Sequence, residues 1–237
     1  MQIDRKKLPG HIAIIMDGNL RWARKRGLAA ILGHANGAKS VEKVTEACRQ
    51  MGIKALTLYA FSTENWKRPA REIDGLMNLL HKYLVKEEKK LLKNGIRLNA
   101  IGRLERLPPK VREKLFEVIE KTSKNVDMIL TLALNYGARQ EITDAVRILA
   151  EKVEKGEISA NDITEEIFEK SLYTKNLPEP DLLIRTSGES RLSNFLLWQV
   201  SYAEIYITDK LWPDFGKADI EKAVLEYQKR ERRYGGR

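Results

Sequence analysis

The 237-residue sequence lacks what several classes of protein require. Its single cysteine, Cys48, excludes an intrachain disulfide and leaves a cysteine-based zinc site three ligands short. No apolar run approaches the ~20 residues of a transmembrane helix, and the run Ile12–Met16 is too short for the core of a signal peptide. No repeat, low-complexity block or flexible linker divides the chain. We therefore expect one cytoplasmic domain over residues 1–237.

The charge is unbalanced. Lysine and arginine number 43 against 33 acidic residues, which gives a formal net charge of +10. Such an excess favours polyanionic or phosphorylated partners. It would also suit a nucleic-acid-binding protein, but the chain has no recognised nucleic-acid motif, and its aromatic residues are not interleaved with basic ones on a strand. We expect no nucleic-acid partner; a steeply salt-dependent affinity for DNA or RNA would revive that alternative.

Six short apolar runs predict strands: His11–Asp17, Ala55–Phe61, Ile96–Gly102, Met128–Tyr136, Leu182–Ser187 and Glu204–Asp209. Most are continuous rather than alternating, as in strands that are covered on both faces. Longer segments with helical spacing lie between them. The pattern predicts an α/β fold around a central, mainly parallel six-stranded sheet flanked by helices. Ligands of such sheets bind beyond the carboxyl ends of the strands.

The first run ends in Asp17-Gly18-Asn19. Glycine and asparagine permit a tight turn, and we expect a helix to start near Arg21. Free backbone N–H groups at such a turn suit a phosphate. Asp17 beside a phosphate is a natural Mg²⁺ ligand. The alternative, in which Asp17 and Asn19 are ordinary turn and cap residues, stays open.

Two other runs end in unusual polar segments. Phe61 to Pro69 combines hydroxyls, an amide, an indole and cations, which suits a ligand that is part apolar and part anionic. The alternative makes Trp66 a core residue and Ser62 a helix cap. Arg185 and Arg191 flank small hydroxyl residues and a glycine, which predicts a site for a second diphosphate.

Three further features have weaker signals. Glu204 opens an apolar strand, where a carboxylate is costly unless it is paired or bound to metal. His34 lies in a segment that resembles a Walker A loop but has three residues between its glycines instead of four, so we exclude NTP hydrolysis by this motif. The basic C-terminal segment is either a solvated helix end or an arm that reaches another subunit's anion site.

Five blocks together resemble the cis-prenyltransferases, with bacterial undecaprenyl diphosphate synthase as the nearest type. They are His11-Ile-Ala-Ile-Ile-Met-Asp-Gly-Asn19, Tyr59-Ala-Phe-Ser-Thr-Glu-Asn-Trp66, Asn135-Tyr-Gly137, Arg185-Thr-Ser-Gly-Glu189 and Arg191-Leu-Ser-Asn-Phe-Leu-Leu-Trp-Gln199. The resemblance runs from His11 to Arg237. It implies repeated addition of isopentenyl diphosphate to an allylic diphosphate such as farnesyl diphosphate. The product is then a long-chain polyprenyl diphosphate, such as undecaprenyl diphosphate, a lipid carrier of cell-wall synthesis.

The same resemblance implies Mg²⁺, a homodimer, a hydrophobic tunnel for the growing chain and peripheral contact with membranes through the lipid product. By position it assigns catalysis to Asp17 and Asn65, and metal binding to Asp17 and Glu204. Substrate binding falls to Gly18, Asn19, Arg21, Trp22, His34, Phe61, Ser62, Trp66, Arg68, Arg185, Arg191, Ser193, Arg233 and Gly235. Arg233 and Gly235 belong to a C-terminal motif that helps to complete the site across the dimer.

Three positions depart from the family pattern. Leu20 stands beside the phosphate turn, Ala30 replaces an arginine that grips the allylic diphosphate, and Ala138 replaces a glycine. Loss of a charge-assisted hydrogen bond costs about 1.5–3 kcal/mol. A weakened or non-catalytic homologue, which binds polyprenyl diphosphates or supports a partner subunit, is therefore the alternative to an active enzyme.

Overall fold

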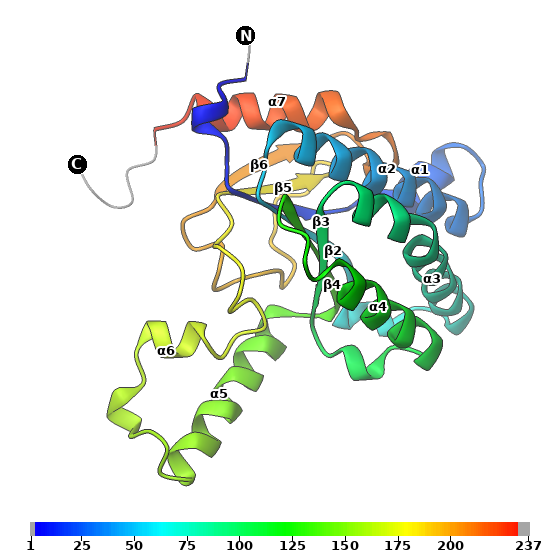
Figure 1. Ribbon diagram of the computed structural model, residues 1–237. Helices are drawn as coiled ribbons and strands as arrows, with labels where there is room; N and C mark the ends of the chain where they lie inside the picture. Colours follow the sequence, from blue (N-terminus) through cyan, green and yellow to red (C-terminus); the bar gives the residue numbers. More distant parts are fainter. Residues whose placement is uncertain (1–2, 232–237) are drawn as a thin grey trace.

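Six strands form a single parallel sheet in the computed structural model, which describes residues 3–231 (Figure 1). The order across the sheet is β3-β4-β2-β1-β5-β6, and every neighbouring pair is parallel. The strands are β1 (His11–Ile15), β2 (Ala55–Ser62), β3 (Ile96–Ile101), β4 (Met128–Tyr136), β5 (Leu182–Thr186) and β6 (Glu204–Thr208). All six predicted strands are confirmed, with ends that shift by at most two residues.

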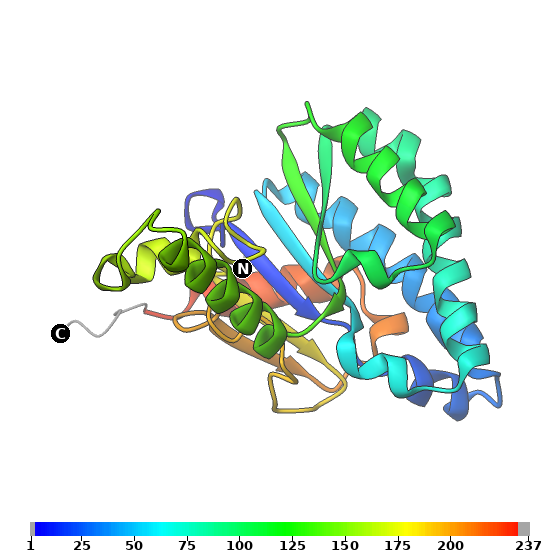
Figure 2. The ribbon, with the colours of Figure 1, turned by 90° about the horizontal axis from the view of Figure 1, so that it is seen from below.

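Helices cover one face of the sheet. The helices are α1 (Asn19–Lys25), α2 (Ala30–Met51), α3 (Ala70–Lys93), α4 (Pro109–Thr122), α5 (Ala138–Glu154), α6 (Glu165–Glu169) and α7 (Lys217–Gln228). Residues of α2, α3, α4 and α7 pack with Ile12 and Ile14 of β1 into the larger core. The alternate residues Ala13 and Ile15 enter a second core on the other face. There the segment 192–203 covers the sheet, while α5 and α6 stand away from it (Figures 1 and 2).

The strand order reverses between β1 and β5. The chain leaves β1 toward β2 on one side and leaves β5 toward β6 on the other. The carboxyl ends of two such neighbouring strands form a crevice, which is where open α/β sheets bind ligands. Ile15 of β1 lies opposite Arg185 of β5, so Asp17 and Arg185 come to this crevice.

The first turn differs from the prediction in detail. The strand β1 ends at Ile15, because the amide of Asp17 bonds to the Ile15 carbonyl at 3.0 Å and to the Thr186 hydroxyl at 2.9 Å. Gly18 then adopts a φ of 105°, and α1 begins at Asn19, two residues before the predicted start at Arg21. The polar residues therefore follow the strand more closely than the sequence suggested.

One face of the edge strand β6 is exposed and not covered by other elements of the described structure; we call it the bare face of β6. Ile205 and Ile207 are 46% and 39% exposed, although Ile205 pairs with the fully buried β5 residue Leu183. Both lie on the side of the second core, beyond the segment that covers it. Separately, no helix in the described part of the chain has both the length and the apolarity to cross a membrane.

His11 joins the first strand to a distant loop. Its Nδ1 lies 2.7 Å from the Pro178 carbonyl and its Nε2 lies 2.8 Å from the Thr57 hydroxyl. Burial lowers the pKa of His11 from 6.5 to about 4, although the Pro178 hydrogen bond and the charge of Asp181 oppose the shift. The folded protein therefore holds His11 in its neutral form.

We predict a loss of stability in mild acid that depends on His11. Between pH 6.5 and 4 the unfolded chain binds a proton that the folded chain excludes, so stability falls as the pH falls through this window. The shift corresponds to at most about 3 kcal/mol. Urea unfolding of the wild type and of His11→Gln at several pH values measures it. The variant should show the shallower pH dependence; parallel curves would contradict the assignment.

Candidate functional site

Asp17 and Arg185 form an ion pair at the crevice. The guanidinium of Arg185 is buried, with 4% of the residue exposed, and its Nη2 donates to Asp17 Oδ2 at 2.9 Å. Its Nη1 donates to the Ser193 hydroxyl at 2.8 Å and to the Arg191 carbonyl. Burial alone would raise the pKa of Asp17, but the hydrogen bond and charge of Arg185, with the charge of Arg21, hold that pKa below its usual value. Asp17 is therefore ionised at neutral pH.

A second cluster of charges extends this pair toward solvent. Arg21 of α1 donates to the Ser187 hydroxyl at 2.5 Å and lies 3.1 Å from Glu189 and 3.5 Å from Asp17. Arg191 pairs with the same Glu189. Both arginines thus bind acceptor groups of the chain itself, and an anionic ligand can compete with these acceptors for the guanidinium groups.

The end of β2 adds a wall to the site. Asn65 Oδ1 accepts from the Ser62 amide at 3.1 Å, which fixes Asn65 as part of the cap of the short helix η2 (Thr63–Lys67). Its amide group remains available to the neighbouring pocket. Trp66 donates to Asn135 Oδ1 at 2.7 Å and packs edge-on against Phe61 at 5.0 Å. Trp66 therefore holds the loop in place, while Phe61 contributes to a cavity wall.

His34 and Arg68 lie beside the same carboxylate, that of Glu72. Arg68 Nη1 lies 2.9 Å from Glu72 Oε1, and His34 Nε2 lies 3.8 Å from the same oxygen. Burial, with the charge of Arg68, lowers the pKa of His34 to about 4 against the opposing charge of Glu72. His34 is therefore neutral at pH 7. Glu72 was not predicted from the sequence, since its position four residues after Arg68 is the only local signal.

Two glycines bring α2 against Asn19. A Cβ at Gly33 would lie 2.2 Å from the Asn19 carbonyl, and one at Gly37 would lie 2.2 Å from Asn19 Oδ1. The glycine-rich segment is thus the interior of α2, and its glycines permit close helix packing. This agrees with the exclusion of a Walker A loop.

Three buried polar atoms in this region have no hydrogen-bond partner in the described structure: Arg185 Nε, Asn19 Oδ1 and His34 Nε2. Buried polar atoms are nearly always satisfied in native proteins, by protein, water or ligand. All three belong to residues that line two neighbouring pockets. The arrangement therefore points to a polar ligand at this place.

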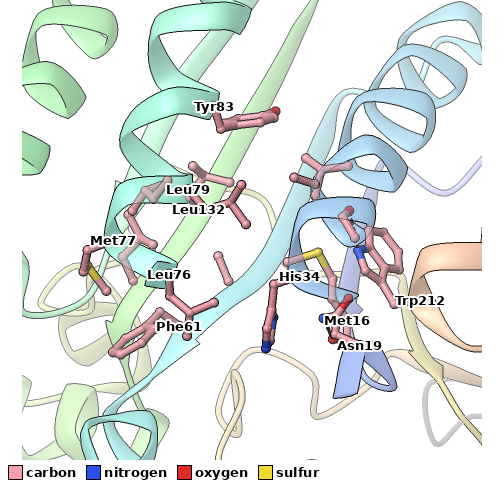
Figure 3. Close-up of a pocket in the computed structure, with 16 residues that line it drawn as sticks. Met16, Asn19, His34, Phe61, Leu76, Met77, Leu79, Tyr83, Leu132 and Trp212 are labelled. Atoms are coloured by element: carbon pink, nitrogen blue, oxygen red, sulfur yellow. Dashed lines mark hydrogen bonds between the residues drawn. The ribbon is translucent and has the colours of Figure 1, made fainter. Parts of the chain in front are cut away.

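The two pockets differ in character. One is open and polar, with a volume of about 1000 Å³, and its lining includes Asp17, Ser62, Asn65, Arg68, Arg185 and Ser193. The other measures about 680 Å³ and lies between α2 and α3 (Figure 3). It is apolar except for His34 and Asn19 near one end and Tyr83 at the other. Met16 lines both pockets. Together they suit a ligand with an anionic head and a hydrocarbon tail.

The donor set near Asp17 fits Mg²⁺ only when a ligand supplies further oxygens. Asp17 Oδ2 is engaged by Arg185, and Oδ1 forms a longer ion pair with Arg21 at 3.5 Å, which a cation at Oδ1 would replace. The described residues contain no cluster of three His, Cys, Asp or Glu side chains that could hold a metal ion. Mg²⁺ typically binds one or two carboxylates together with phosphate oxygens, so the residues present fit it.

Glu204 does not join this site within one chain. It pairs across the sheet with Leu182, three residues before Arg185, and therefore lies at the amino-terminal edge of the sheet. Arg230 binds its carboxylate at 2.6 Å. Ile12 of β1 pairs with Leu182, and Asp17 lies five residues after Ile12, beyond the end of that strand. The two carboxylates are thus roughly 16 Å apart along the strands, and the assignment of both to one ion fails within a single chain.

Other predicted positions have supporting roles. Trp22 is buried against the short helix η5 (Trp212–Asp214), donates to Asp214 at 2.7 Å and lines neither pocket. Gly18 is required by its positive φ and by the close contact that a Cβ would make with Leu211, at 2.9 Å. Arg233 and Gly235 lie outside the described residues.

The three departures from the family pattern fit the fold. Leu20 is exposed, so its side chain need not crowd the turn. Ala30 is the first residue of α2. Ala138 is buried, and its amide bonds to the Asn194 carbonyl at 2.8 Å.

Comparison with known proteins explains this arrangement. The undecaprenyl diphosphate synthase family model (Prenyltransf) matches residues 15–235. The chain belongs to this family. It is 50% identical over 230 residues to an isoprenyl transferase of Clostridium perfringens, covering 97% of this chain and 91% of that protein. It is 48% identical over 236 residues to the ditrans,polycis-undecaprenyl-diphosphate synthase ((2E,6E)-farnesyl-diphosphate specific) of Haemophilus influenzae, covering 100% of this chain and 99% of that one.

Two solved structures of family relatives share the fold. Lavandulyl diphosphate synthase from Lavandula x intermedia, in complex with dimethylallyl diphosphate, superposes with a TM-score of 0.95 at 40% identity, over 97% of this chain and 99% of that one. A "probable undecaprenyl diphosphate synthase" from Campylobacter jejuni gives a TM-score of 0.78 at 40% identity, over 96% and 98% of the two chains. The family membership and the fold predicted from the sequence are confirmed.

We predict that inorganic pyrophosphate binds at the crevice and depends on Arg185. Arg185→Met removes the fork that includes the unpartnered Nε, and about 10- to 100-fold weaker binding should follow, because a charged hydrogen bond contributes about 1.5–3 kcal/mol. Arg147→Met is the matched control, since Arg147 lies on α5 with its side chain 64% exposed. Calorimetry gives both affinities. Equal binding by wild type and Arg185→Met would contradict the site.

Proposed function

We propose that the protein is a cis-prenyltransferase that condenses isopentenyl diphosphate with an allylic diphosphate, farnesyl diphosphate in the first instance, into a long-chain polyprenyl diphosphate. The observation that carries this proposal is the polar pocket around Asp17 and Arg185, which opens beside an apolar cavity between α2 and α3. A diphosphate head with a hydrocarbon tail matches the pair. The names of the relatives support the same reaction.

The chain's own residues divide the work between two diphosphates. Arg185, Arg191 and Ser193 lie on one side and bind the isopentenyl diphosphate. Asn19 and His34 line the apolar cavity, and Arg21 lies on α1 beside Asp17. These three residues bind the allylic diphosphate, whose tail enters that cavity. Because the two pockets adjoin at Met16, substrates bound in this way have their reacting carbons near each other. The reaction then takes place between two positioned substrates and needs no encounter in solution.

The reaction then needs charge stabilisation. The allylic C1–O bond breaks and its electron pair leaves with the diphosphate, while the isopentenyl double bond forms the new C–C bond to C1. A proton passes from C2 of the isopentenyl unit to an oxygen of the released diphosphate, and a new double bond forms between C2 and C3. Arg21 is placed to stabilise the charge that develops on the leaving group. Asn65, fixed by its bond to the Ser62 amide, presents its amide group to the reacting region.

We propose that Asp17 holds Mg²⁺ through Oδ1 together with diphosphate oxygens. The cation would supply further neutralisation of the charge on the diphosphate. The ion pair with Arg185 keeps Asp17 ionised and fixes its orientation for this role.

The direct test is an assay with radiolabelled isopentenyl diphosphate, with farnesyl or dimethylallyl diphosphate as the starter. We expect Mg²⁺-dependent release of diphosphate and a ladder of polyprenyl products, which a chelator abolishes.

Asp17→Asn should lower kcat by about 10²- to 10³-fold, because it removes the charge that the site organises. Glu120→Gln, at an exposed carboxylate on α4, is the control. A folded chain that binds both substrates without turnover would support the non-catalytic alternative.

We also expect Tyr83 to limit product length. Its buried ring crosses the end of the apolar cavity that lies farthest from Asn19 (Figure 3). Tyr83→Ala should lengthen the longest products by about one or two isoprene units, because the lost ring leaves a space of similar size. Tyr83→Phe keeps the ring and should keep the wild-type ladder. An unchanged ladder for Tyr83→Ala would place the limit elsewhere.

We propose in addition that two copies pair through the bare face of β6. Exposed isoleucines on an edge strand favour burial against a partner. Sedimentation equilibrium tests it, and a monomer at micromolar concentration would contradict it.

A further inference from the structure

Four large apolar side chains are exposed around the turn between α1 and α2. Leu20, Leu28, Ile31 and Leu32 are each 39–43% exposed, and we call them the α1–α2 patch. Single exposed apolar residues are normal on a protein surface. Four of them within 13 residues of one helical hairpin are a local concentration that favours burial against a partner.

The patch lies near the end of the apolar cavity that Asn19 and His34 line. Ile31 Cδ1 lies 2.9 Å from the position of a Cβ on Gly75, so the patch reaches across to α3. His34, one turn further along α2, lines the cavity, as does Asn19, which precedes Leu20. The turn lies at the periphery of the molecule in both views (Figures 1 and 2). A hydrocarbon tail that leaves between α2 and α3 would therefore meet this surface.

Basic side chains border the patch. Arg24 and Lys25 are exposed at the end of α1, and Arg71 is exposed on α3, one turn before Gly75. Within residues 3–231 none of these three side chains takes part in a hydrogen bond or ion pair with the rest of the chain. Arg26 differs, because it stacks on Trp22 and pairs with Asp214. Three cations that are unpaired in the described structure thus lie near the exposed apolar side chains, two of them on α1 and one on α3.

We propose that the α1–α2 patch docks on the surface of an anionic lipid bilayer. Leu28, Ile31 and Leu32 would enter the boundary between headgroups and acyl chains, and Arg24, Lys25 and Arg71 would face the anionic headgroups. A second copy of the chain fits this surface poorly. A symmetric contact through the patch would bring Arg24 and Lys25 of both copies together, and like charges oppose such a contact.

The use of this docking rests on the proposed function, since a long polyprenyl product is insoluble in water and would pass from the cavity mouth into the bilayer. The binding itself needs no turnover. A wild-type chain that turns over its substrates but does not bind vesicles therefore refutes the docking surface alone, whereas a wild-type chain that binds vesicles without turnover refutes the enzyme alone.

The test is flotation of the full chain with vesicles of phosphatidylglycerol and phosphatidylcholine, compared with vesicles of phosphatidylcholine only. We expect binding to the anionic vesicles that weakens as salt is added. The double variant Leu28→Glu, Leu32→Glu should bind them at least about tenfold more weakly. Val146→Glu is the matched control, because Val146 is an exposed apolar residue on α5. It should bind like the wild type.

A second variant, in which Arg24 and Lys25 are both replaced by glutamate, reverses the charge and leaves the apolar side chains in place. Circular dichroism shows whether each variant folds. If the leucine variant does not fold, the charge-reversal variant tests the proposal. Turnover in detergent should match the wild type for every folded variant. Three results would overturn the proposal: no binding by the wild type, equal binding by wild type and both patch variants, or equal loss with Val146→Glu. A lower mass of the leucine variant in sedimentation would also overturn it, because the patch would then join two copies.

Discussion

The ion pair between Asp17 and Arg185 is the interaction on which the rest of the site depends. It links the ends of β1 and β5, the two strands between which the sheet reverses its direction of winding. A buried guanidinium without a counter-charge would be costly, so the fold keeps Asp17 ionised and fixed. The same geometry leaves Arg185 Nε without a hydrogen-bond partner in the described structure, in a residue that lines the polar pocket. Asp17 and Arg185 therefore carry charges that both the fold and the binding of substrate need.

The packing of α2 supplies the second half of the site. Gly33 and Gly37 let this helix lie against Asn19, while α3 diverges enough to leave an apolar cavity between the two helices. Polar head and apolar tail thus have adjacent but separate surroundings. The polar crevice and the apolar cavity favour different parts of one substrate, which explains how a single small domain can hold a growing amphipathic chain. The surface at the turn before α2 likewise combines charged side chains with apolar ones on the outside of the molecule.

Much of this could be predicted from the sequence, and the reasons are physical. Continuous apolar runs gave all six strands, and the polar residues directly after them met at one sheet edge, as parallel strands require. Arg185 stood out because a charge that closes an apolar strand needs a partner. Long-range pairs could not be predicted in this way. Glu204 drew attention for the same reason as Arg185, but it starts its strand and its partner is Arg230, 26 residues later. The bond from Trp66 to Asn135 and the approach of His34 to Glu72 join elements whose order in space no local pattern reveals.

The account is tested most directly by a crystal structure with a non-hydrolysable thio analogue of farnesyl diphosphate, isopentenyl diphosphate and Mg²⁺. It predicts one diphosphate at Arg185 and Ser193, the other beside Asn19, Arg21 and His34, and the farnesyl chain between α2 and α3 with its end directed to Tyr83. A farnesyl chain that lies outside this cavity, or diphosphates that bind away from Asp17 and Arg185, would contradict the account.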